Sequence, residues 1–243
     1  MKYIRDKKDL DGKIVILRLD LNVPIKNGKI VDETRINKIL PIFNHLIERK
    51  SKIIVISHVG RPEGRTHENL SLEIICKCLE IKLQKKIKLV KENIYDLTKI
   101  NLFQRFVDQI IFLENIRFYK EEEENDNNFA KQLASLGDLF VNDAFSCSHR
   151  NHASVSEIAK FIPSYAGLQL ETEINALRKV TIEIKKPITC IIGGSKISTK
   201  IQVIKNLIPK FDNFVIVGGM ANNILKYKGH PIGKSIQEKN CDK

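Results

Sequence analysis

The sequence has no tryptophan, only two methionines, and aromatic residues at just 7% of its 243 positions. No apolar run reaches the length of a membrane span. The first residues, MKYIRDKKDLDGK, lack the apolar core of a signal peptide. We therefore expect a globular protein that neither crosses nor binds a membrane, and 42% hydrophobic residues are enough to build its core.

Cysteine is also scarce. The five cysteines are an odd number and contain no C-x-x-C pair; they are Cys76, Cys78, Cys147, Cys190 and Cys241. A disulfide framework normally uses an even number of cysteines, so we expect reduced, structural thiols and a cytoplasmic location.

The charge is strongly one-sided, because 41 basic residues outnumber 29 acidic residues and give a formal net charge of +12. Two classes of function fit this balance: a non-catalytic basic module that binds nucleic acid, and an enzyme that handles small polyanions. The lysines are dispersed, with few aromatic residues among them. This pattern favours a solvated lysine-rich surface over a face that binds a nucleic acid duplex.

Residues 13–24, KIVILRLDLNVP, form the stretch around which the rest of the chain is organised. Their apolar run predicts a strand buried on both faces, as in a parallel sheet. If the strand continues, alternation places Arg18, Asp20 and Asn22 on one face. An arginine–aspartate pair that closes a strand end is the alternative interpretation.

Strand and helix patterns then alternate along the chain. Predicted strands cover residues 52–57, 87–90, 109–113 and 139–141, and predicted helices cover 32–50, capped by Asp32, 72–83 and 129–136. The segment 121–128, EEEENDNN, predicts a solvated loop. This order indicates βαβ units, and therefore an α/β fold with a three-layer parallel sheet and helices on both faces, Rossmann-like in class.

Cationic side chains follow four of these strands. Arg18, Arg61, Arg117 and Arg150 lie at strand ends, and His58 and Arg35 join them if the crossover is right-handed. Strand ends of a parallel sheet share one edge, where such a cluster of charges would repel unless an anion sits between them. The pattern predicts a small phosphorylated or carboxylated ligand.

Two carboxylates and two histidines in these loops raise the question of acid–base or metal chemistry. We expect Glu114 and Asp143 to pair with nearby arginines rather than act as catalytic carboxylates. His149 and His152 lack a cysteine or an acidic partner at ligand spacing, so we expect no metal site there.

The last third of the chain has its own pattern. A helix is expected over 167–184, and strands over 188–192 and 214–217 run into the glycine turns Gly193-Gly194 and Gly218-Gly219. The first turn continues through Lys196 and Lys200 into a helix at 201–207. Free amides and a positive helix end suit phosphate, although the Walker A spacing is absent. Two strands cannot form a stable core, so we expect a second domain cut off partway.

Seven motifs follow one another along the chain: RLDLNVP (18–24), DETRI (32–36), SHVGRP (57–62), LENIRF (113–118), NDAFSCSHRNHAS (142–154), GGSKISTK (193–200) and GGMAN (218–222). In this order they resemble the phosphoglycerate kinase family. The resemblance implies a hinged two-domain kinase of glycolysis, with an acid-binding N-terminal domain over 1–166, an interdomain helix over 167–184 and the start of a nucleotide-binding domain over 185–243. Closure about that helix is the expected gating step.

The resemblance also implies the reaction and its residues. The family transfers a phosphoryl group reversibly between 1,3-bisphosphoglycerate and ADP, giving 3-phosphoglycerate and ATP, with Mg on the nucleotide. It would assign 3-phosphoglycerate to Asp20, Asn22, Arg35, His58, Arg61, Arg117 and Arg150, with Arg18 in the same basic cluster. It would assign the nucleotide to Gly193, Gly194, Lys196, Lys200, Gly218 and Gly219. Arg35 and Lys196 are the expected catalytic residues.

The sequence departs from the family pattern in several places. Val59 replaces a leucine, and Ser146-Cys147-Ser148 replaces the more usual Gly-Thr-Ala before His149. The family's later nucleotide motifs are absent. We therefore expect a monomer that binds 3-phosphoglycerate without turnover, and we assign the enzymatic activity to the parent protein.

Overall fold

The computed structural model describes residues 1–105 and 110–238, which divide into two compact units, Met1–Ile174 and Asn175–Lys243. Gln109 of the predicted strand 109–113 and Cys241 lie outside the described residues. No described helix combines the length and the apolar character that a bilayer crossing requires.

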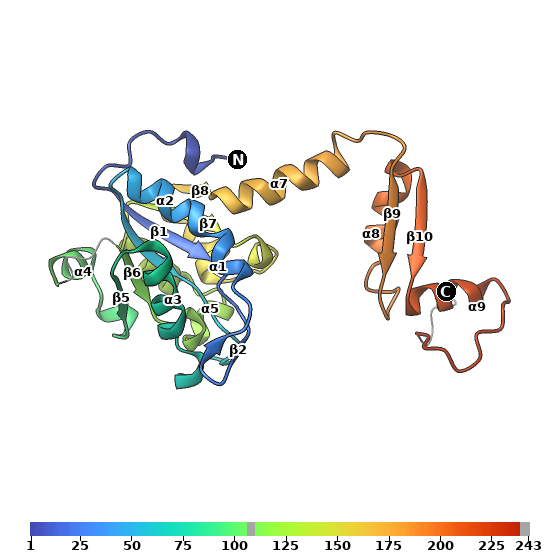
Figure 1. Cartoon of the computed structure of the whole chain (residues 1–243), viewed down its shortest axis with the longest axis horizontal. Helices are drawn as coiled ribbons and strands as arrows, with labels where there is room; N and C mark the ends of the chain where they lie inside the picture. The colour runs from blue at the N-terminus through green and yellow to red at the C-terminus, as the bar shows by residue number, and fades with distance from the viewer. Residues whose placement is uncertain (106–109, 239–243) are drawn as a thin grey trace. The chain divides into compact units, whose positions relative to one another are not determined.

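The first unit is built on a six-stranded, fully parallel sheet with the strand order β5-β6-β4-β1-β7-β8 (Figure 1). The strands are β1 (Ile14–Leu19), β4 (Lys52–Ile56), β5 (Ile87–Val90), β6 (Ile110–Leu113), β7 (Leu139–Asp143) and β8 (Ser164–Ala166). A small antiparallel hairpin, β2 (Ile25–Lys26) and β3 (Lys29–Ile30), follows β1. The predicted parallel α/β sheet is confirmed.

Helices cover both faces of this sheet. They are α1 (Thr34–Lys38), α2 (Leu40–Glu48), α3 (Glu73–Leu83), α4 (Lys99–Arg105), α5 (Lys120–Glu123), α6 (Asn127–Ser135) and α7 (Leu168–Thr181), whose last turns belong to the second unit. Every residue of β1 is buried, as expected for a strand covered on both faces. Val15 and Leu17 pack with Phe43 of α2 on one face, and Ile14 and Ile16 belong to the other core.

Pro41 explains one wrong prediction, the single helix over residues 32–50. The structure has two helices that meet at Ile39, with Pro41 in the first turn of α2. A proline has no N–H to donate to the carbonyl four residues earlier, so α1 cannot run on through it. Asp32 still acts at the start, where its carboxylate accepts the Thr34 amide at 2.8 Å.

Glu122 overturns a second prediction, the solvated loop over residues 121–128. Residues 120–123 form α5, and the Glu122 side chain is fully buried. Asp126 then caps α6 by accepting the Phe129 amide at 2.7 Å. The first strand is also shorter than its pattern suggested, because β1 ends at Leu19 and leaves Asp20 and Asn22 in the following loop.

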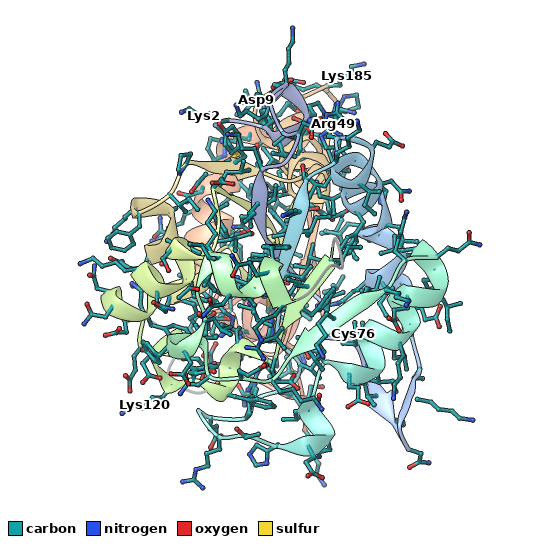
Figure 2. All side chains as sticks on the ribbon, turned by 90° about the vertical axis from the view of Figure 1, so that its left-hand side faces the viewer. Lys2, Asp9, Arg49, Cys76, Lys120 and Lys185 are labelled. Atoms are coloured by element: carbon teal, nitrogen blue, oxygen red, sulfur yellow. The ribbon has the colours of Figure 1, made fainter. Side chains whose placement is uncertain are left out.

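Figure 2 distinguishes the two ends of this unit. Lys2, Asp9 and Arg49 lie at one end, and Lys120 lies toward the other. Arg49 lies three residues before β4 begins at Lys52, whereas Lys120 follows β6, so the carboxyl ends of the strands lie at the Lys120 end. Ligands of parallel α/β sheets bind at that edge.

The second unit contains a two-stranded parallel sheet of β9 (Thr189–Gly193) and β10 (Asn213–Val217). Helix α8 (Ile201–Leu207) connects the strands, and α9 (Gly219–Tyr227) follows β10. The structure has α8 at the residues predicted for a helix. The predicted domain limits at 166 and 185 stay a prediction.

Candidate functional site

Four neighbouring strands bring the predicted cationic residues to one edge of the first unit. In the sheet, β1 lies between β4 and β7, and β6 lies beside β4. Arg18 of β1 is level with Ile56 of β4 and with Asn142 of β7. The loops that follow these strands therefore start side by side, which is how residues more than a hundred positions apart in sequence come together.

His58 lies at the centre of this edge. It is 3% exposed, and its Nδ1 lies 3.2 Å from a terminal nitrogen of Arg18. Burial and the positive charges of Arg18, Arg117 and Arg150 lower the pKa of His58 to about 2. The imidazole is therefore neutral at physiological pH. The three guanidinium groups whose charge opposes its protonation come from β1 and from the loops after β6 and β7.

Arg117 is fixed in place by the loop after β4. Its side chain is only 4% exposed, donates to the Gly60 carbonyl at 3.1 Å and lies 3.4 Å from Glu123. Burial lowers the pKa of Arg117, the charge of Arg150 adds to this, and Glu123 opposes it. The atom that faces Glu123 is its buried Nε, which makes no hydrogen bond among the described residues. A buried guanidinium at this edge is suited to bind an anion.

A second group forms around Asp20. One carboxylate oxygen accepts hydrogen bonds from both Arg35 and Ser146, and the other accepts the Asn22 amide at 3.2 Å. Asp20, Arg35 and Ser146 line a cavity of about 200 Å³, together with Lys38 and Asp143. The exposed Arg35 is thus held by Asp20 toward the edge, although it comes from α1.

Asn22 binds the backbone of the neighbouring loop. Its Oδ1 accepts the Gly60 amide at 2.9 Å, and the Gly60 carbonyl accepts Arg117. Gly60 has a φ of +66°, which favours glycine, and an added Cβ would lie 2.7 Å from Leu70. The predicted residue Arg61 follows Gly60 and is exposed.

The prediction that Glu114 and Asp143 pair with arginines is wrong, because both carboxylates accept hydrogen bonds from backbone amides instead. Glu114 accepts hydrogen bonds from the Ser71 hydroxyl and the Leu72 and Asn115 amides, at 2.6–2.8 Å. Asp143 accepts the Leu170 amide at 2.8 Å. Both carboxylates bind backbone at the start of a helix, and sequence spacing does not reveal such partners.

Sequence reasoning missed three residues that support the site. Ser146 binds Asp20, Ser154 binds Arg18, and the buried Glu122 binds Ser154. Ser146 and Ser154 stand inside the motif over residues 142–154, so their position carried a signal. Glu122 stands in a run of four glutamates, where nothing marks it from its neighbours.

A metal ion does not suit the cluster that comes closest to a ligand set. Atoms of Asp20, His58 and Cys147 that are able to bind a metal lie within 4.8 Å of one another, and carboxylate, imidazole and thiolate are zinc ligands. However, the arginine charges that keep a proton off His58 also oppose a divalent cation beside it. Of the two histidines for which no metal site was expected, His149 and His152, the second has its Nδ1 3.7 Å from the buried Glu122 carboxylate.

In the second unit, the two predicted glycine turns lie against each other. The Met220 amide donates to the Gly194 carbonyl at 2.9 Å, and a Cβ on Gly219 would lie 3.2 Å from the Ser195 backbone. A cavity of about 350 Å³ is lined by these turns. The Lys200 side chain approaches Gly194, whereas Lys196 is exposed.

Comparisons with known proteins agree in one family. The model of the phosphoglycerate kinase family matches residues 4–243. The phosphoglycerate kinase of Wolbachia sp. subsp. Brugia malayi (strain TRS) is 50% identical over 234 residues, which cover 96% of this chain and 58% of that protein. The one from Dictyoglomus turgidum is 47% identical over 235 residues, covering 97% and 59%.

Solved structures are similar over the same range. Phosphoglycerate kinase from Coxiella burnetii has a TM-score of 0.87 at 38% identity, covering 98% of this chain and 59% of that one. The structure from Pyrococcus horikoshii OT3 has a TM-score of 0.81 at 28% identity, covering 96% and 59%. The chain therefore spans less than two thirds of the length of these relatives.

Proposed function

The chain belongs to the phosphoglycerate kinase family, and from that premise we propose that its first unit binds 3-phosphoglycerate and that the whole protein transfers a phosphoryl group between 1,3-bisphosphoglycerate and ADP. The observation that carries this proposal is the set of guanidinium groups around His58. Arg117 and Arg150 act on a buried, neutral imidazole, and Arg35 lies nearby on Asp20. A small, doubly anionic sugar acid is the class of ligand that would balance these charges.

Each predicted binding residue has a task in this proposal. Arg117 and Arg150 supply charge to the acid, and His58 supplies a neutral donor. Asp20 and Asn22 hold Arg35 and the Gly60 loop. The exposed Arg61 completes the set from the surface.

The reaction suits residues that bind charge and do not move protons. When 3-phosphoglycerate is the acceptor, the attacking group is a carboxylate, which is already ionised at neutral pH, so no general base is needed. Neutral His58, with a pKa of about 2, is a poor base and fits this requirement. Phosphoryl transfer is catalysed mainly by alignment and positive charge, which we assign to Arg35 and Lys196.

The second unit would receive the nucleotide. Backbone amides of Gly193, Gly194, Gly218 and Gly219 line or adjoin one cavity, and Lys200 approaches it. Amides and ammonium groups of this kind bind phosphate. Mg²⁺ would arrive as part of the nucleotide substrate, on its phosphate oxygens.

A calorimetric titration of the chain with 3-phosphoglycerate tests the proposal. We expect saturable binding that Arg150→Ala weakens at least about tenfold, because a charge-assisted hydrogen bond contributes roughly 1.5–3 kcal/mol. The matched control is Arg49→Ala at the opposite end of the unit, which should leave the affinity unchanged (Figure 2). Absence of binding, or equal effects of both variants, would refute the acid site.

The same sample distinguishes the nucleic-acid alternative, which neither the comparisons nor the arginine arrangement favours. A binder of nucleic acid loses affinity steeply with salt along a long footprint. Binding of a labelled RNA or DNA duplex that millimolar 3-phosphoglycerate fails to displace would support that alternative.

A further inference from the structure

Arg18 is fully buried, and its hydrogen bonds point into the protein. Its Nε donates to the Ser154 hydroxyl at 2.9 Å, and one terminal nitrogen donates to the Leu19 carbonyl. The other terminal nitrogen is 3.2 Å from Nδ1 of His58. All three nitrogens of this guanidinium therefore have partners inside the protein. Arg18 influences a bound ligand through His58 and does not contact the ligand itself.

Ser154 connects Arg18 to a buried anion. Its hydroxyl donates to one oxygen of Glu122 at 2.6 Å, and its amide donates to the other at 2.8 Å. A hydroxyl has one proton, so Ser154 can only accept from Arg18 with its lone pair. Burial opposes ionisation of Glu122, but contacts with His152, Arg18 and Ser154 outweigh it and hold its pKa below the usual range.

The direction of these hydrogen bonds determines where the proton of His58 lies. An arginine donates and never accepts, so Nδ1 of His58 must be the acceptor. The ring is neutral at physiological pH because burial and the surrounding arginines lower its pKa. Its single proton is therefore on Nε2.

We propose that Glu122 and Ser154 position Arg18, and that Arg18 in turn holds His58 as the tautomer protonated on Nε2. His58 then offers the ligand one N–H donor from a fixed ring. Glu122, Ser154 and Arg18 are positioning residues in this arrangement. The identity of the acceptor, an anionic oxygen of the acid, rests on the proposed function; the tautomer does not.

The other groups that face His58 are consistent with this role. Arg117, Arg150 and His152 act on it from the loops after β6 and β7, and atoms of Asp20 and Cys147 lie within 4.8 Å of its ring nitrogen. Most of these charges are positive, so they keep the ring neutral but do not select a nitrogen. Among the described residues, the hydrogen bond from Arg18 makes that selection.

Long-range ¹H–¹⁵N NMR of the imidazole nitrogens tests the inference on the whole chain, with His58 assigned by comparison with His58→Gln. At pH 7 and at pH 5 we expect an unprotonated Nδ1 and a protonated Nε2. In Ser154→Ala, Arg18 loses the acceptor of its Nε, and we expect the His58 signals to shift toward a mixture of tautomers. Affinity for 3-phosphoglycerate should fall roughly tenfold.

Ser51→Ala is the matched control, because Ser51 is equally buried but binds the Leu10 carbonyl at the other end of β4. It should change neither the His58 signals nor the affinity. Arg18→Lys is a second variant in case Ser154→Ala folds poorly. One ammonium group cannot reach Ser154, the Leu19 carbonyl and His58 together, so the tautomer should again be lost.

Two results would overturn the inference. One is that His58 in the unsubstituted chain carries its proton on Nδ1, or is an imidazolium at pH 7. The other is a folded Ser154→Ala or Arg18→Lys variant whose His58 signals match the parent's. If the tautomer and its loss are as expected but 3-phosphoglycerate does not bind the parent, the proposed function fails and the positioning of His58 stands.

Discussion

Asp143 at the end of β7 accepts the backbone amide of Leu170 in the first turn of α7, at 2.8 Å. Its other carboxylate oxygen is buried without a hydrogen-bond partner among the described residues. Burial is the main reason that the pKa of Asp143 is raised to about 6, and the Leu170 and Gln169 amides only partly oppose it. Gly167 is equally constrained, because a Cβ there would lie 2.3 Å from Asp143.

Because the pKa of Asp143 is raised, ionisation of this buried carboxyl should lower the stability of the protein as pH increases. Between about pH 4 and pH 6 the folded state holds a proton that the unfolded state has released, so the free energy of unfolding falls with pH. Replacing Asp143 by asparagine keeps an oxygen for the Leu170 amide and removes the titration. Relative to the unsubstituted chain, the free energy of unfolding of Asp143→Asn should rise by about 2.5 kcal/mol between pH 4 and pH 8, as measured by urea unfolding at both values.

Asp138 provides a control of opposite sign. Burial works against its ionisation, but the hydrogen bond from the Ile14 amide and the ion pair with Lys99 outweigh this and hold its pKa below the usual value. Its stabilisation is therefore lost as pH falls, so Asp138→Asn should cost more stability at pH 7 than at pH 3. If the effect of Asp143→Asn does not change with pH, the carboxyl is not buried as described.

Glu122→Ala should be strongly destabilising. It removes the buried carboxylate that accepts the Ser154 hydroxyl and amide, and leaves the fully buried Arg18 without the anion linked to it through Ser154. Breaking a buried ion pair from one side costs roughly 3–5 kcal/mol. Chemical denaturation of the variant measures this loss directly.

Glu124→Ala is the matched control for that variant, because Glu124 stands in the same run of glutamates and is exposed. Its effect should stay within about 0.5 kcal/mol of the parent. Equal losses in the two variants would contradict a special role for Glu122.

The residues at the edge of the sheet were predictable because topology alone brings them together. Once the strands are known to be parallel, the loops after them must meet, and the structure has Arg18, Arg117 and Arg150 acting on His58. The anion that accompanies Arg18 was not predictable. Glu122 is buried because α5 packs near residues 153–157, which lie some thirty positions later in the chain.

The partners of Glu114 and Asp143 could not be read from the sequence for a related reason. A carboxylate beside arginines suggests an ion pair, but a backbone amide at a helix start competes for the same oxygens. Which partner binds depends on where Leu72 and Leu170 are placed by the tertiary structure. The end of α1 before Pro41 is different, because the sequence itself contains the signal. Proline indicates that a helix cannot continue through this point, but the apolar periodicity on both sides predicted one continuous helix.

Asn22→Ala should weaken the binding of 3-phosphoglycerate severalfold and lower the free energy of unfolding by no more than about 1 kcal/mol. Asn22 is exposed, and its main contact is the Gly60 amide, whose own carbonyl holds Arg117. Loss of one exposed hydrogen bond costs about 1 kcal/mol, enough to let this loop shift. Calorimetry gives the affinity, and Asn101→Ala in α4 is a control that should leave it unaltered.

Gly218 and Gly229 allow backbone strain to be separated from crowding in the second unit. Both have positive φ, +68° and +82°, but only Gly218 has a close neighbour: an added Cβ would lie 3.3 Å from the Gly194 carbonyl oxygen. Its ψ of −156° also lies in a region that is essentially restricted to glycine. Gly218→Ala should therefore separate the two glycine turns, whereas Gly229→Ala should cost only about 1–2 kcal/mol of local backbone strain.

Amide hydrogen exchange measures this difference at the Met220 N–H, which donates to the Gly194 carbonyl at 2.9 Å. Protection at that amide should be lost in Gly218→Ala and largely kept in Gly229→Ala, since exchange reports the opening of individual hydrogen bonds. Equal protection in both variants would mean that the turns do not depend on each other. In that case the contact between the turns would not hold open the cavity that they line. The proposal that Gly193, Gly194, Gly218 and Gly219 bind the nucleotide phosphates would then lose its structural basis.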